Sequence, residues 1–95
     1  MTESFGVAAF RSRQQVLRFE SALRRAGLSA EVVSTPRDVS IGCGLSVRFS
    51  LHQADQVMSV FHRIGPSNLI GFYRVDRSGN TGSQLTPLML PRRML

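Results

Sequence analysis

The chain has 95 residues, of which 42% are hydrophobic, and this size suits one small globular domain. Its net charge is +6, and all twelve basic residues are arginines. Without a lysine the chain has no amine for Schiff-base or P-loop chemistry, and arginine favours acidic partners or bound anions.

The single cysteine excludes an intramolecular disulfide and every zinc site that needs several cysteines. No apolar run approaches the length of about 18 residues that a membrane-spanning helix needs. The opening "MTESFGVAAF" does not resemble a signal peptide. We therefore expect a cytoplasmic protein that does not insert into a membrane and has no cofactor.

The first part of the chain predicts a strand, a helix and a second strand. "FGVAAF" (Phe5–Phe10) is apolar on both faces, which is typical of a buried strand. Ser12 and Gln15 have the spacing of a capping box at a helix start. Apolar residues on one helical face follow: Val16, Phe19, Leu23 and Ala26. Gly27 ends this helix, and "SAEVV" (Ser29–Val33) predicts the second strand.

The second part repeats this plan. "LSVRFS" (Leu45–Ser50) alternates apolar and polar residues, as a half-buried strand does. Ser50 and Gln53 predict a second capping box. The apolar face of the second helix comprises Ala54, Val57, Phe61 and Ile64. Gly65 ends the helix, and "LIGFYRV" (Leu69–Val75) predicts the last strand.

The element order predicts an α+β fold: a ferredoxin-like βαββαβ sandwich, with a four-stranded antiparallel sheet and both helices on one face. Right-handed crossovers give the strand order 4-1-3-2. We assign residues 1–76 to this domain. The topology places the end of the first strand, the start of the first helix and the start of the third strand at one edge, so Cys43 is expected near Ser12.

Residues 77–95 are expected to form a linker and an irregular apolar C-terminal tail. "RSGNTGSQ" has the composition of a linker, and "LTPLMLPRRML" contains two prolines that disfavour a helix. Apolar side chains in a tail indicate docking, on the chain's own sheet or on a partner. The candidate partner-docking residues are Ile70, Phe72, Leu88, Met89 and Leu90.

Cys43 lies between Gly42 and Gly44. A lone cysteine is often just a small buried hydrophobe. Here, however, it is in a predicted loop that two glycines leave open. A helix N-terminus and nearby cations lower the pKa of a thiol and favour the nucleophilic thiolate. The groups expected to stabilise an anion there are Ser12, Arg11, Arg13 and Arg37.

No catalytic set is apparent around this cysteine. His52 is predicted at the opposite edge of the sheet, and His62 falls off the apolar face of its helix. One cysteine and two scattered histidines do not make a metal site. We therefore expect a carrier or accessory protein rather than an enzyme.

The stretch "FESALRRAGLSAEVVSTPRDVSIGCGLSVRFSLHQADQV" resembles the small selenium/sulfur-carrier-like family. The resemblance covers about Gly6–Val75. It rests on Thr35-Pro36-Arg37, Ser40 and Cys43-Gly44, in which Pro36 and Ser40 would shape the loop. It implies that Cys43 holds sulfur or selenium as a persulfide or selenopersulfide for transfer to a partner protein. Arg37, Gly42 and Gly44 would then help to stabilise that anion.

Two other interpretations remain open. The protein could be a non-catalytic subunit or adaptor, or a homodimer, that docks through its open sheet face and tail. RNA binding suits the charge but fits less well, because sheet-based RNA recognition needs exposed aromatic residues on the central strands. The alternation of residues 45–50 turns Phe49 inward, away from such a surface.

Overall fold

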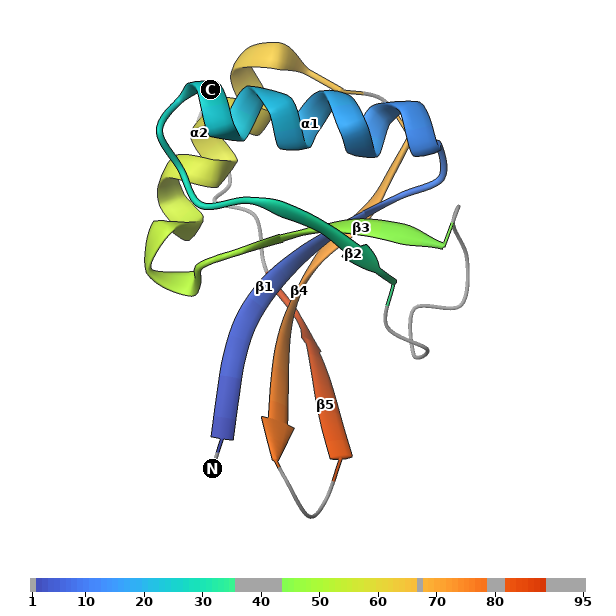
Figure 1. The fold of residues 1–95 in the computed structure, drawn as a ribbon, viewed down its shortest axis with the longest axis vertical. Helices are drawn as coiled ribbons and strands as arrows, with labels where there is room; N and C mark the ends of the chain where they lie inside the picture. The colour runs from blue at the N-terminus through green and yellow to red at the C-terminus, as the bar shows by residue number, and fades with distance from the viewer. Residues whose placement is uncertain (1, 36–43, 67, 79–81, 89–95) are drawn as a thin grey trace, which may run out of the picture.

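The computed structural model describes residues 2–35, 44–66, 68–78 and 82–88 of the chain (Figure 1). Their elements are β1 (Thr2–Phe10), α1 (Arg13–Arg25), β2 (Glu31–Ser34), β3 (Leu45–Phe49), the short 3-10 helix η1 (Leu51–Gln53), α2 (Ala54–Ile64), β4 (Leu69–Ser78) and β5 (Gly82–Pro87). The strands form one sheet in the order β2-β3-β1-β4-β5, with every neighbouring pair antiparallel.

The predicted α+β architecture is confirmed, but the predicted number of strands is wrong. The sheet has five strands because residues 82–87, expected in the linker and the irregular tail, pair with β4 from Ser78↔Gly82 to Tyr73↔Pro87. β4 continues to Ser78, so residue 77 belongs to a strand rather than to a linker. Strand β5 therefore forms the edge of the sheet next to β4.

The first helix starts where the sequence predicts, whereas α2 begins only at Ala54, after η1, and neither predicted capping bond forms. Ser12 precedes α1 and Ser50 precedes η1, yet neither side chain caps its helix. The side-chain oxygen of Gln53 instead accepts a hydrogen bond of 3.0 Å from the backbone N–H of Ser29. Gln53 thus connects the start of α2 to the loop after α1, which fixes the two helical segments relative to each other.

A main core lies between the helices and the sheet. Its aromatic residues contact one another edge to face, with Phe19 of α1 touching Phe10, Phe61 and Phe72. The predicted helix faces are correct at the buried residues Val16, Phe19, Leu23 and Val57. They are wrong at their ends, because Ala26 caps α1 in an exposed position and Ile64 is 40% exposed.

A second apolar cluster, the open-face cluster, lies on the opposite face of the sheet. It comprises the buried Phe5, Val7 and Val75, with the partly buried Val33, Tyr73 and Leu85 packed against them. All six residues come from strands. Figure 1 shows β2 and β3 crossing β1 and β4 at a steep angle. This twist allows Val33 from one edge strand and Leu85 from the other to pack on the same cluster.

Candidate functional site

The segment that carries the only cysteine leaves the sheet at one end of the β2–β3 hairpin. Thr35 is the last described residue before it and Gly44 the first after it. The other candidate residues of this segment lie outside the described residues: Pro36, Arg37, Ser40, Gly42 and Cys43. Thr35 and Gly44 are thus the described positions that hold the two ends of this segment.

These two positions are hydrogen-bonded to each other. The backbone N–H of Thr35 donates to the carbonyl oxygen of Gly44 at 2.9 Å, directly beyond the last strand pair, Ser34↔Leu45. Gly44 has φ of +88°, a conformation that glycine adopts without the steric penalty of a side chain. A glycine after the cysteine is thus required by the backbone at the start of β3.

A pair of hydroxyl groups reinforces the same place. Thr35 Oγ1 and Ser46 Oγ lie 2.8 Å apart, and Ser46 is completely buried. A buried hydroxyl needs a partner, because leaving it unpaired is unfavourable by about 1–3 kcal/mol. The alternation of residues 45–50 predicts Ser46 on the polar face of its strand, but neither its burial nor this partner. The pair fixes β2 to β3 just before the cysteine segment.

The start of α1 lies at the same edge of the sheet. Ala9 of β1 pairs with Ser46, two residues after Gly44, and α1 begins shortly after β1 ends. Figure 1 shows the start of α1 and the start of β3 on the same side of the molecule. The predicted convergence of the first-helix start and the third-strand start is therefore present among the described residues.

Two of the candidate arginines extend from this edge into solvent. Arg11 and Arg13 are exposed, and neither forms an ion pair within the described part of the chain. The backbone N–H of Arg11 donates to the carbonyl of Asn68 at 2.7 Å, which joins the end of β1 to the start of β4. Because Ser12 supplies no side-chain cap, the first-turn amides of α1 are not occupied by its hydroxyl.

The predicted docking residues do not form one surface. Phe72 is 3% exposed and contacts Phe19, Phe49 and Phe61 in the main core, so its assignment to a docking surface is wrong. The alternation of β4 turns Phe72 towards the helices, and Tyr73 and Val75 take the open face instead.

The end of the described chain docks on the protein itself. Leu88 packs partly buried against the main core, and its N–H donates to the carbonyl of Phe72 at 2.8 Å. Ile70 is half-buried in β4. Met89 and Leu90 lie outside the described residues. The tail was expected to dock on its own sheet or on a partner, and as far as Leu88 it packs in cis.

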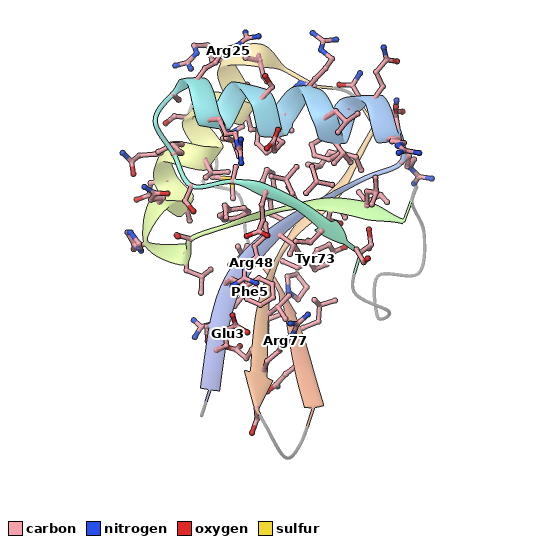
Figure 2. The ribbon with its side chains drawn as sticks, viewed as in Figure 1. Glu3, Phe5, Arg25, Arg48, Tyr73 and Arg77 are labelled. Atoms are coloured by element: carbon pink, nitrogen blue, oxygen red, sulfur yellow. The ribbon has the colours of Figure 1, made fainter. Side chains whose placement is uncertain are left out.

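A charged cluster on the open face was missed by the sequence analysis. The guanidinium of Arg48 lies over the Phe5 ring and also binds Glu3 at 2.8 Å, and Arg77 approaches the same ring (Figure 2). A hollow of about 440 Å³ opens beside Arg48, between β3 and the loop after α1. Strand alternation predicts that Arg48 and Phe49 point to opposite faces of the sheet. It does not predict the contact with Phe5, which lies 43 positions away in the sequence.

His52 does not lie at the edge of the sheet that holds the cysteine segment. His52 lies in η1, after β3 has crossed the sheet, and lines the hollow beside Arg48. Among the described residues, no group of three histidine or acidic side chains is arranged to hold a metal ion. Nor does any helix of the described chain have the length and apolarity needed to cross a membrane.

A comparison with known proteins identifies the protein family of this chain. A protein-family model described as "Putative Se/S carrier protein-like" matches residues 5–69. No curated protein and no solved structure matches the chain. The matched residues run from β1 to the start of β4 and include the Pro-Arg and Cys-Gly positions on which the resemblance rests. Because this match spans more than half of the sequence, the chain belongs to the Se/S carrier protein-like family.

Proposed function

We propose that this protein carries sulfur or selenium as a persulfide or selenopersulfide on Cys43. The observation that carries the proposal is the family match, which includes the segment with the chain's only cysteine. In this role the protein is a carrier between a donor and an acceptor protein rather than an enzyme that turns over a substrate.

The transfer step needs no oxidant or reductant. The Cys43 thiolate attacks the terminal sulfur of a persulfide on the donor protein. The donor's sulfur–sulfur bond breaks, its cysteine leaves as a thiolate, and a new sulfur–sulfur bond forms on Cys43. The same exchange with a selenopersulfide would load selenium. Delivery to the acceptor is the same type of exchange with the carrier as the donor.

The described geometry supports this role in two ways. The Thr35–Gly44 hydrogen bond and the Thr35–Ser46 hydroxyl pair fix both ends of the cysteine segment to the sheet. The start of α1, with exposed Arg11 and Arg13, lies at the same edge. Helix amides and guanidinium groups stabilise sulfur anions. A carried persulfide is such an anion, and it needs no general base.

Intact-mass spectrometry tests the proposal. The purified protein is incubated with a cysteine desulfurase and cysteine, or selenocysteine in a second arm, and its mass is measured without reductant. We expect a mass increase of one sulfur or one selenium atom, reversed by dithiothreitol. Cys43→Ser should show no increase.

Two further variants make the test specific. Arg13→Gln should slow loading, whereas Arg63→Gln removes the same charge from α2 and should not. Wild-type protein that stays unmodified while the desulfurase releases sulfide would overturn the proposal. Equal labelling of Cys43→Ser would do so as well, because the added atom would then not be on this cysteine.

A further inference from the structure

Two exposed apolar side chains on different helices share one hollow. Leu17 of α1 is 49% exposed and Ile64 of α2 is 40% exposed, and they are the large hydrophobic residues with that exposure in the described chain. Both line a hollow of about 370 Å³ between α1 and the end of α2, with Ala22 among its other lining residues. Their exposure is therefore concentrated at one place rather than scattered, and scattered single exposures would need no explanation.

The hollow continues past the end of α2. A second, smaller hollow of about 100 Å³ shares Arg18 and Ile64 with the first and extends to Gly65 and Pro66. We call the two together the interhelix groove. Ala22 packs partly buried against the main core, so the base of the groove is continuous with the fold's interior.

The charge along the groove is positive. Arg18 and Arg25 line it, are exposed, and form no ion pair with any residue that the structure describes. Figure 2 shows Arg25 on the helix layer, on the side away from the sheet. The acidic residue of α1, Glu20, is bound to Arg24 at 2.8 Å and does not neutralise them.

We propose that the interhelix groove binds an amphipathic, acidic segment of a partner protein. An apolar stripe on that segment would cover Leu17 and Ile64, and carboxylates beside the stripe would face Arg18 and Arg25. Burying apolar surface supplies affinity, and guanidinium–carboxylate pairs supply orientation and faster encounter. The proposal does not depend on Cys43.

The chemistry of the groove selects this partner class. A second copy of the chain would bring arginines against arginines, which like-charge repulsion opposes. Single-stranded nucleic acid needs exposed rings for stacking, but none of the described phenylalanines, nor Tyr73, is exposed. An acidic amphipathic segment satisfies both the apolar residues and the unpaired guanidinium groups.

Fluorescence anisotropy with a designed probe tests the proposal. The probe is a labelled helical peptide of about 18 residues, long enough for five turns, with leucines on one face and glutamates beside them. We expect this peptide to bind wild-type protein, with an affinity that falls as the salt concentration rises. A peptide with lysine in place of glutamate should not bind.

Two double variants locate the binding. Leu17→Ser with Ile64→Ser should weaken binding about tenfold or more, as loss of buried anchors does. Arg18→Gln with Arg25→Gln should weaken it similarly and flatten its salt dependence. Arg24→Gln is the matched charge control, since Arg24 is on α1 but does not line the groove. Circular dichroism checks that each variant is folded.

Several outcomes would overturn the proposal: no binding of the acidic peptide, equal binding of the lysine peptide, or undiminished binding by the Leu17/Ile64 variant. A single-stranded RNA oligomer that binds more tightly, and responds only to the arginine variants, would assign the surface to nucleic acid instead. Cys43→Ser should bind the peptide as wild type does. Failure of persulfide loading and failure of this groove are therefore distinguishable.

Discussion

The guanidinium carbon of Arg48 lies 4.0 Å from the centroid of the Phe5 ring, on the sheet face that carries no helix. The same guanidinium binds the carboxylate of Glu3 at 2.8 Å, and the side chain of Arg48 is 32% exposed. One arginine from β3 therefore covers the aromatic ring of β1 and neutralises the acid two residues earlier on that strand.

Replacing Arg48 by glutamine should destabilise the fold by about 1–2 kcal/mol, because it removes a partly buried cation–π contact together with an ion pair. Urea unfolding followed by circular dichroism measures this change. Arg77→Gln is the control, since Arg77 is exposed and lies 5.2 Å from the same ring. Its effect should be clearly smaller, and equal losses for the two variants would contradict the assignment.

The hydroxyl pair at the cysteine segment gives a second prediction. Thr35→Val leaves the fully buried Ser46 hydroxyl unpaired, whereas Ser46→Ala leaves only the half-buried Thr35 hydroxyl. The first change should therefore destabilise more than the second, within a range of about 1–3 kcal/mol. Unfolding of both single variants and the double variant gives the coupling energy of the pair. A coupling energy near zero would show that the two hydroxyls do not depend on each other.

The helices and the first four strands could be predicted because the spacing of apolar residues within each segment indicates them. Apolar spacing gave the faces of α1 and α2 correctly near their middles, at Phe19 and Val57. The same spacing failed at Ile64, which is 40% exposed in the last turn of α2. A periodic pattern shows which face of a helix is apolar but not how far along the helix that face is buried.

Strand β5 could not be predicted from its own residues. "GSQLTP" combines glycine, serine and proline with a single large apolar residue, Leu85, and such a sequence has little strand propensity. It is a strand because β4 offers a free edge and Val75 pairs with Leu85. The preference arises from tertiary contacts, which local pattern does not contain.

The candidate site was predictable at the level of topology and not at the level of contacts. The connection order placed the start of α1 and the start of β3 at one edge, in agreement with the Ala9↔Ser46 pair. Strand alternation likewise gave the facing of Ser46 and Arg48. The partners Thr35 and Phe5 depend on the sheet's twist and register, which single-strand patterns do not fix.

Asp76 gives a pH-dependent prediction. A hydrogen bond from the Ser4 hydroxyl lowers the pKa of Asp76, partial desolvation opposes this, and the hydrogen bond and charge of Arg74 lower it further. A carboxyl whose pKa is lower in the folded state stabilises the fold above its unfolded value, here 3.8, and loses that contribution as pH falls through the folded value. Asp76 therefore contributes at neutral pH and not in acid.

Asp76→Asn should accordingly lower stability at about pH 7 and have little effect at about pH 2, where the wild-type carboxyl is protonated as well. Urea unfolding of both proteins across this range measures the difference. Asp55→Asn is the control, because Asp55 forms no ion pair among the described residues. A gap between wild type and Asp76→Asn that stays constant with pH would contradict the linkage.

Gly6 supplies the last prediction, through its close approach to Phe49. A Cβ at Gly6 would overlap ring atoms of Phe49, which pairs with it across β1 and β3. Phe49 is 1% exposed and packs against Phe72 with ring centroids 6.1 Å apart, so it has no space into which to move. Gly6→Ala should therefore destabilise the fold by about 1–3 kcal/mol, as overpacking of a filled core does.

Gly71→Ala is the matched control, because its Cβ would meet mainly the far end of the partly exposed Tyr73 side chain, which can rotate away. Thermal and urea unfolding should rank Gly6→Ala well below Gly71→Ala in stability, and the reverse ranking would mean that Phe49 is not fixed where the sheet meets the helices.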